Sequence, residues 1–581
     1  MTLANLQQHF SNGGSPSDVI RDIYQKISEW NDPALFIHLP SEEELLEIAA
    51  QVEAMPRDLP LWGIPFVIKD NIDVAGWPTT AACPDFSYIP DADAEVVRLL
   101  RAAGAIPIGK ANLDQFATGL VGTRSPYGVA RNAIAPGWLP GGSSSGSASA
   151  LAAGLCSFSL GTDTAGSGRV PAAFQELIGC KPTRGLLSIL GVVPACRSLD
   201  CVSIFAHNPA DAAAVLQVAC KADAADPFSR EISQSPAFPE TFRFGVPSAL
   251  DFSGDPDTPE LFDEAVRNLE ARGGTAVPID LTPFTEAARL LYEGPWVAER
   301  WAAVGDFVQA HPESVFPVTR QILEASQKWD AATTFKAQYR LRELARQCEP
   351  VWQSIDVLLL PTTPRLYTVE ENLADPIATN SVLGRYTNFM NLLDLAAVAL
   401  PAGRARSGKV PWGVTLAAPA GSDIALLDLS SRLLDQPRLK ISTPPATIPI
   451  VVCGAHMEGL ALHWQLTDRG ATLRQRGTTA PCYRLFAMPA SGSIPPRPAL
   501  VHDAEKGTAI EVEVWDLTAA AFGDFVAQIP APLGIGKVTL ADGQTLPGFI
   551  AEPRATDQAE EITRFGGWRA WLQNPRGIPS P

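Results

Sequence analysis

Two serines and one lysine have the residue types needed for nucleophilic catalysis: Ser143, Ser167 and Lys69. Ser167 lies in GTDTAGSG (161–168), a turn of small residues whose backbone N–H groups could approach a ligand and stabilise an oxyanion. Lys69 follows the apolar run LWGIPFVI, where burial would lower its pKa and let it act as a base. A neutral lysine can activate a serine hydroxyl, as histidine does in a Ser-His-Asp triad. The local sequence alone favours a competing interpretation, an ordinary ion pair of Lys69 with Asp70 or another carboxylate.

Motifs for other kinds of chemistry are absent from the sequence. None of the seven histidines lies in the Gly/Ser-rich segment around the two serines, and none has the HExxH spacing of a metal site. Ser167 is not part of a GxSxG elbow, and the phosphate-binding pattern GxxxxGK[ST] is missing, so a turn without chemistry is the remaining alternative at 161–168. We therefore expect no metal and no cofactor.

The segments around these residues alternate between helical and strand-like patterns, which predicts an α/β core. Helical spacing begins after Ser15 and after Ser41, which we expect to be N-cap residues. Further helices are predicted at 94–104 and from about 258 to 350, and strands at 61–68, 105–109, 355–361 and 396–401.

A change of composition near residue 440 predicts two domains. The stretch 436–449 (QPRLKISTPPATIP) is rich in proline and short polar residues, as linkers are. Strand-like alternation follows it. We predict a first domain over 1–440, a linker that includes 441–446, and a small α+β domain over 447–581.

The net charge and the cysteines limit the binding partners and the cellular compartment that we expect for the protein. A net charge of −18 argues against binding to nucleic acid or to an anionic membrane. The nine cysteines contain no CxxC pair, which favours reduced thiols. The first residues, MTLANLQQHFSNGGSPSD, lack the basic and apolar regions of a signal peptide. We expect a cytoplasmic protein with no membrane association.

The span PGGSSSGSASALAAGLCSFSLGTDTAGSGRVPAAFQELIGCKPTRG, with GIPFVIKD upstream, resembles the amidase signature family. The resemblance implies a large mixed β-sheet covered by helices on both faces. It also implies a Ser–cis-Ser–Lys triad in which Ser167 is the nucleophile, Ser143 relays the proton through a cis peptide, and Lys69 is the base. The oxyanion would be held by the backbone amides of Thr164, Ala165, Gly166 and Ser167. Ala165 stands where many members have glycine, which is tolerable if its backbone torsion is ordinary.

Two further segments, NLDQFATGLVGTRSPYG (112–128) and LLYEGPWVAERW (290–301), are similar to allophanate hydrolases within that family. The resemblance implies that Tyr292 and Arg300 hold the substrate, with Gly122 as a weaker candidate for a backbone contact. The two residues are eight positions apart, so a continuous helix would place both on one face. The alternative is that they are ordinary residues of an amphipathic helix.

The C-terminal segment resembles the allophanate hydrolase C-terminal domain, whose fold is similar to gamma-glutamyl cyclotransferases. The family links this domain to decarboxylation of N-carboxycarbamate, the product of the amidase step, so that allophanate is converted to ammonia and carbon dioxide. His456, in CGAHMEGL, matches the family's GAH element and could handle a proton. A hydrogen-bonded structural histidine is an equal alternative, and we do not assign a role to His463.

Two other functions compete with allophanate hydrolysis. A broad amidase for small amides would show no preference for a carboxylate. An amidotransferase subunit would need partner chains and would leave 447–581 without a task. The resemblance also suggests urea carboxylase as a partner and a homodimer as the assembly.

Overall fold

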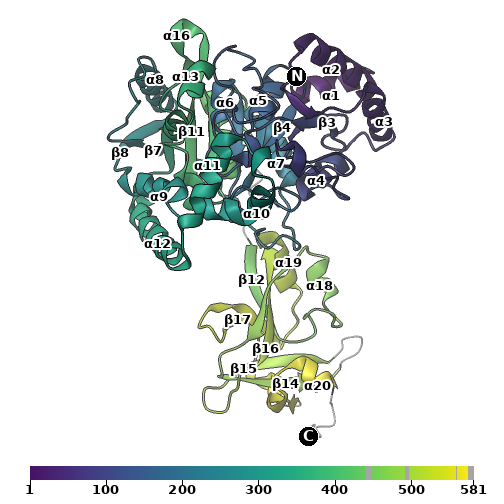
Figure 1. Cartoon of the computed structure of the whole chain (residues 1–581). Helices are drawn as coiled ribbons and strands as arrows, with labels where there is room; N and C mark the ends of the chain where they lie inside the picture. The colour runs from purple at the N-terminus through teal and green to yellow at the C-terminus, as the bar shows by residue number, and fades with distance from the viewer. Residues whose placement is uncertain (440–446, 491–495, 558, 574–581) are drawn as a thin grey trace. The chain divides into compact units, whose positions relative to one another are not determined.

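The computed structural model describes residues 1–439, 447–490, 496–557 and 559–573. The chain divides into two compact units, Met1–Ile441 and Ser442–Pro581 (Figure 1). Each unit has a hydrophobic core of its own. The predicted linker at 441–446 lies outside the described residues. Within the described ranges, no helix has both the length and the apolar character that crossing a membrane requires.

The first unit is built on one mixed sheet of eleven strands. Parallel pairs (β3–β2–β4 and β9–β7–β8) lie toward the two ends, and the strands between them pair antiparallel. In spatial order the strands are β1 (Phe36–His38), β3 (Ile106–Ala111), β2 (Pro65–Lys69), β4 (Phe158–Asp163), β6 (Cys201–Ala206), β5 (Ile178–Lys181), β10 (Leu395–Arg404), β11 (Val410–Pro419), β9 (Val357–Pro361), β7 (Phe242–Pro247) and β8 (Gly274–Ile279).

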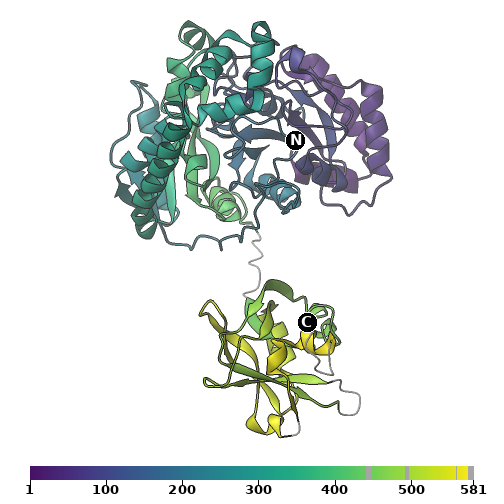
Figure 2. The same cartoon turned by 60° about the horizontal axis from the view of Figure 1, so that its bottom comes forward.

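Helices cover both faces of this sheet, as the family resemblance implied (Figure 2). The longer ones are α1 (Leu3–Ser11), α2 (Pro16–Trp30), α3 (Glu42–Glu53), α4 (Glu95–Ala102), α5 (Ser145–Ala152), α7 (Pro209–Ala219), α8 (Thr258–Ala271), α9 (Thr282–Tyr292), α10 (Val297–Ala310), α11 (Pro317–Ala325), α12 (Ala331–Ser354) and α17 (Asp423–Leu433). Two of them begin as predicted, because Ser15 and Ser41 each form a capping box with an acidic residue three positions on.

The prediction of a strand at 61–68 was wrong at its start. Residues 61–63 form a turn in which Gly63 has φ +73°, and the strand β2 begins at Pro65. Glycine adopts this left-handed conformation without a steric penalty, so the chain can reverse there before it enters the sheet. The consequence for the site is that Lys69 is the last residue of a short, fully buried strand.

The predicted helical region at 258–350 also contains an unpredicted strand. β8 lies at the edge of the sheet and pairs in parallel with β7. Gly273 has φ +92° and follows the end of α8, after which the sequence GTAVPI is extended. Four helices (α9–α12) follow it and carry the residues expected to bind substrate.

The second unit consists mainly of strands, with three short α-helices among its described residues. A five-stranded sheet has the order β13-β16-β12-β18-β17, and a three-stranded sheet has the order β15-β14-β19. The strands are β12 (Thr447–Val452), β13 (Thr472–Thr478), β14 (Tyr483–Met488), β15 (Arg497–His502), β16 (Glu511–Thr518), β17 (Leu533–Thr539), β18 (Thr545–Ala551) and β19 (Glu560–Glu561). The helices are α18 (Trp464–Thr467), α19 (Ala519–Ala527) and α20 (Trp568–Gln573).

Candidate active site

The amino group of Lys69 is buried at the end of β2 and makes two hydrogen bonds. Its Nζ lies 2.8 Å from Ser143 Oγ and 2.7 Å from Thr162 Oγ1. Burial lowers the pKa of Lys69 to about 7, so a large share of the amine is neutral near neutral pH. The predicted alternative of an ion pair with Asp70 is wrong, because Asp70 pairs with Lys110 at 3.2 Å. The geometry is that of a lysine able to accept a proton from Ser143.

Ser143 is held just before α5 by its backbone. The Gly142–Ser143 peptide is cis, as the family resemblance implied. The amide of Asp114 donates to the Ser143 carbonyl at 3.1 Å, and a Cβ at Gly142 would lie 2.1 Å from the Asp114 carboxylate. Only glycine fits at position 142, and this close packing places the Ser143 hydroxyl against Lys69.

Ser167 lies in the turn that follows β4. Its hydroxyl donates to the carbonyl of Gly119 at 3.4 Å, and no hydrogen bond among the described residues joins it to Ser143. Catalytic hydrogen bonds are often long or poorly aligned before substrate binds. A relay would therefore begin with rotation of the Ser167 hydroxyl from Gly119 toward Ser143.

The turn that carries Ser167 is fixed by a buried ion pair between Asp163 and Arg169. Arg169 donates from Nη2 and Nε to the two Asp163 carboxylate oxygens at 2.8 and 2.9 Å. The same carboxylate accepts the amides of Gly166 and Gly168, each at 2.9 Å. The Gly166 N–H is thus occupied in this state. Among the described residues, the amides of Ala165 and Ser167 have no acceptor, so they are free to meet an oxyanion.

Two further features of this turn bear on the oxyanion. Ala165 has no positive φ, so its methyl group replaces the family's glycine without backbone strain. The Thr164 hydroxyl donates to buried Asp200, which also accepts the amides of Ala195 and Cys196. Burial raises the pKa of Asp200 to about 6. No local pattern in the sequence indicates a role for Asp200, because it lies 36 positions from Thr164 and belongs to no recognised motif.

Tyr292 and Arg300 meet, but not on one helix. Tyr292 is the last residue of α9 and Arg300 lies in the first turn of α10, with a break at 293–296 that contains Gly294 and Pro295. The continuous helix that would place both residues on one face is not formed, because Pro295 removes an amide donor and disfavours helical torsions in the residue before it. Arg300 Nη2 nevertheless donates to the Tyr292 hydroxyl at 3.4 Å.

One loop connects Arg300 with Ser167. Arg300 Nη1 donates to the Thr118 hydroxyl at 3.0 Å and to the Ala117 carbonyl at 3.3 Å. The next residue, Gly119, accepts the Ser167 hydroxyl. Arg300 is only 2% exposed, so its guanidinium is a buried cation held against the loop that contacts Ser167.

Gly122, the weaker candidate, lies in the same loop with φ +78°. Its amide donates to Asp114 Oδ2 at 3.0 Å, and Asp114 also accepts the amides of Val121 and Arg124. Since its N–H is occupied, Gly122 could offer a ligand only its carbonyl. Asp114 holds the loop in place, a role that the sequence did not suggest.

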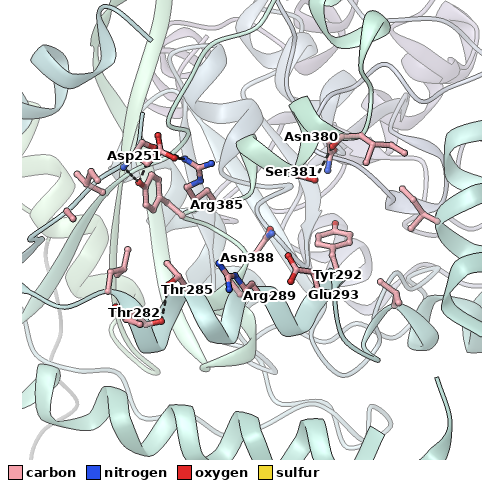
Figure 3. Close-up of a pocket in the computed structure, with 18 of the residues that line it drawn as sticks. Asp251, Thr282, Thr285, Arg289, Tyr292, Glu293, Asn380, Ser381, Arg385 and Asn388 are labelled. Carbon is pink, nitrogen blue, oxygen red and sulfur yellow. Dashed lines mark hydrogen bonds and ion pairs between the residues drawn. The ribbon is translucent and has the colours of Figure 1, made fainter. Parts of the chain in front are cut away.

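A cavity of about 1080 Å³ includes Tyr292 and Arg124 in its wall, whereas Lys69, Ser143, Ser167 and Arg300 are not among the residues that line it. Arg289, Tyr292 and Glu293 enter it from the end of α9, while Asn380, Ser381, Arg385 and Asn388 enter it from the facing segment (Figure 3). Asn380 accepts the amide of Leu120 at 2.8 Å, which ties the cavity wall to the loop beside Ser167. The volume is at the upper end for small-molecule sites.

His456, in the second unit, is mostly enclosed by aromatic rings. It stacks on Phe549 with 5.1 Å between centroids and meets Phe525 edge-on, and its Nε2 lies 2.9 Å from Gln465 Oε1. Burial lowers the pKa of the imidazole. The adjoining cavity of about 20 Å³ has the size of a water molecule, so a larger ligand could reach His456 only after its neighbours move.

Comparisons with known proteins agree with this architecture. The family model "Amidase" matches residues 18–427, and the model "Allophanate hydrolase C-terminal domain" matches residues 448–573. The chain therefore belongs to the amidase family, hydrolases that act on amide carbon–nitrogen bonds, and it carries the C-terminal domain of allophanate hydrolases.

Individual relatives are consistent with this. The chain is 42% identical to urea amidolyase of Lachancea kluyveri over 93% of its own length, but spans only 31% of that protein. It is similar to the solved allophanate hydrolase of Kluyveromyces lactis, with 39% identity, a TM-score of 0.73 and 99% of both chains covered. A glutamyl-tRNA(Gln) amidotransferase subunit of Natronomonas pharaonis is 34% identical, over 65% of this chain and 96% of that protein.

Proposed function

We propose that this chain hydrolyses allophanate, a urea derivative whose acyl side carries a carboxylate, and releases ammonia from it. The observation that carries the proposal is the buried guanidinium of Arg300, held against Tyr292 and joined to the Ser167 side of the site by the loop 117–119. A planar guanidinium is the side chain best suited to a carboxylate. The full-length likeness to an allophanate hydrolase supports the same substrate.

In the proposed reaction, the oxygen of Ser167 attacks the terminal amide carbon. Its proton passes to Ser143, whose own proton passes to the neutral amine of Lys69. The amides of Thr164, Ala165 and Ser167 stabilise the oxyanion, joined by Gly166 if its amide is released from Asp163. The carbon–nitrogen bond then breaks, the relay returns a proton to the leaving ammonia, and water releases N-carboxycarbamate from Ser167.

The second part of the proposal is a division of labour between a domain at 1–440 and a domain at 447–581. The first performs the hydrolysis, and the second removes carbon dioxide from the dicarboxylate product, with His456 donating the proton that replaces the departing carboxylate on nitrogen. Burial lowers the pKa of this imidazole, and a dianion beside it would raise the pKa again and supply the proton-donating form.

The competing functions fit less well. If the chain were an amidotransferase subunit, its C-terminal domain would have no task, since the amidotransferase relative matches only 65% of this chain. A broad amidase does not require a buried arginine at the acyl side. We further propose a cytoplasmic homodimer without metal or cofactor, and urea carboxylase as a functional partner, because the urea amidolyase relatives are much longer than this chain.

Arg300→Lys tests substrate recognition. We expect the rate of allophanate hydrolysis (kcat/KM) to fall roughly ten- to a hundredfold, because a lysine keeps the charge but loses the planar pair of donors. Biuret, in which an amide replaces the carboxylate, should be affected less than about threefold, on the order of a single neutral hydrogen bond. Ammonia release from both substrates is the measurement. Equal losses on the two substrates would assign Arg300 a structural role through Thr118 and Ala117.

Shortening the chain to residues 1–440 tests the division of labour. We expect it to fold, because its core is separate from that of the second unit, and to release one ammonia from allophanate. N-Carboxycarbamate should then accumulate and decay at its uncatalysed rate, as followed by carbon-13 NMR. Adding residues 447–581 should speed the decay, and adding the same fragment with His456→Ala should not. If the dicarboxylate disappears equally fast in all three mixtures, the second domain is not a decarboxylase.

A further inference from the structure

A second buried arginine, Arg124, lies in the wall of the same cavity as Tyr292. It is 2% exposed and belongs to the loop that Asp114 holds in place. Its Nη1 donates to the Thr118 carbonyl at 2.9 Å, and its Nη2 donates to the Pro376 carbonyl at 2.6 Å. Its Nε is buried and has no partner among the described residues.

Thr118 connects Arg124 to Arg300. The carbonyl of Thr118 accepts from Arg124, while its hydroxyl accepts from Arg300 at 3.0 Å. The two guanidinium groups are therefore both fixed to one residue, one position before Gly119, which accepts the Ser167 hydroxyl.

In the part of the chain that the structure describes, neither arginine has a carboxylate within ion-pair distance. The nearby carboxylate of Asp114 is occupied by three backbone amides instead. Burial lowers the pKa of Arg124, the charge of Asp114 opposes this shift, and the positive charge of Arg300 adds to it. The pKa of Arg300 is raised despite its burial, because Cys196, Tyr292 and two more distant carboxylates favour its charged form. Two buried, unpaired cations are costly to a fold, and an anion between or beside them would offset that cost.

We propose that Arg124 is a second recognition residue of the active site, acting with Arg300 on small amides whose acyl part is anionic. This inference rests on the proposed function in one respect, the placement of the substrate amide beside Ser167. The expectation that the ligand is an anion does not depend on the proposed function. The pair would thus favour binding of the substrate carboxylate.

The kinetic test compares allophanate with biuret in the Arg124→Gln variant. We expect kcat/KM for allophanate to fall roughly ten- to a hundredfold, the range of a charge-assisted contact, and that for biuret to change less than about threefold. Arg267→Gln is the matched control, because Arg267 is an exposed arginine of α8 outside the cavity, and it should leave both rates unchanged. Equal losses on both substrates would mean that Arg124 only supports the loop, and the proposal would be overturned.

A binding test separates this inference from the choice of substrate. In a Ser167→Ala background, calorimetry with malonate and with neutral malonamide should show malonate binding at least about tenfold weaker after Arg124→Gln and no change for malonamide. Arg124→Lys, which keeps the charge, should bind malonate more tightly than Arg124→Gln. If Arg124→Gln does not fold, Arg124→Lys replaces it in the comparison with the wild type. Malonate binding that is independent of the residue at 124 would overturn the inference. Failure of the wild type to hydrolyse allophanate would overturn only the proposed function.

Discussion

The Ser167→Ala variant is expected to lose amide hydrolysis by a factor on the order of 10⁶, the scale on which removal of a serine nucleophile acts. The substitution removes one oxygen, whose only hydrogen bond among the described residues is a 3.4 Å contact with the Gly119 carbonyl. The buried Asp163–Arg169 pair that shapes the turn is untouched. Thermal unfolding should therefore be close to that of the wild type, and the loss should lie in kcat, measured as ammonia release.

Ser203 offers a matched control for this prediction. It is a fully buried serine directly behind the same turn, close to Gly168, and its hydroxyl has no partner among the described residues. Ser203→Ala should retain nearly all activity. Ser143→Ala should lose less than Ser167→Ala, because a water molecule can partly replace a relay but not a nucleophile. A Ser167→Ala protein that keeps activity within about tenfold of the wild type would show that another residue attacks the amide.

The contacts that could be predicted from sequence are those encoded by short motifs. The capping boxes at Ser15 and Ser41 join residues three positions apart, and both were predicted. Lys69 and Ser143 are 74 positions apart, and their contact was expected only because each lies in a motif of the amidase signature. The roles of the site residues in catalysis remain predictions, and the structure adds the distances on which they depend.

The unpredicted contacts join common residue types across long sequence separations. Asp114, Thr162, Asp200 and Arg124 act on the site through backbone amides, hydroxyls and carbonyls, which no local pattern reveals. The Tyr292–Arg300 pair was predicted, yet with the wrong local geometry, because Gly294 and Pro295 break the helix and the loop 117–118 helps to hold Arg300 in place. Tertiary contacts therefore decide how residues named by a motif meet.

Lys69 is expected to set the pH dependence of the reaction. Because burial lowers its pKa to about 7, the amine is protonated and inactive as a base below that pH and neutral above it. The kcat/KM of the wild type should rise with pH, approaching about tenfold per unit well below the pKa, and reach a plateau above it. The pH profile of kcat/KM reports on Lys69 if the charge of the substrate does not change over the same pH range.

Two substitutions at position 69 separate basicity from charge. Lys69→Ala removes the base and should lower kcat by roughly 10²- to 10⁴-fold, the range for general acid–base catalysis. Lys69→Arg keeps a cation that stays protonated at every accessible pH, so it should be as inactive as the alanine variant and show no rise between about pH 6 and 9. Both effects follow from the 2.8 Å contact between Lys69 Nζ and Ser143 Oγ, through which the proton passes in the proposed relay. An active Lys69→Arg enzyme with an unshifted pH profile would mean that the lysine acts by its charge. The base would then have to be sought at Asp200, a buried carboxylate that accepts the Thr164 hydroxyl and whose pKa is raised to about 6.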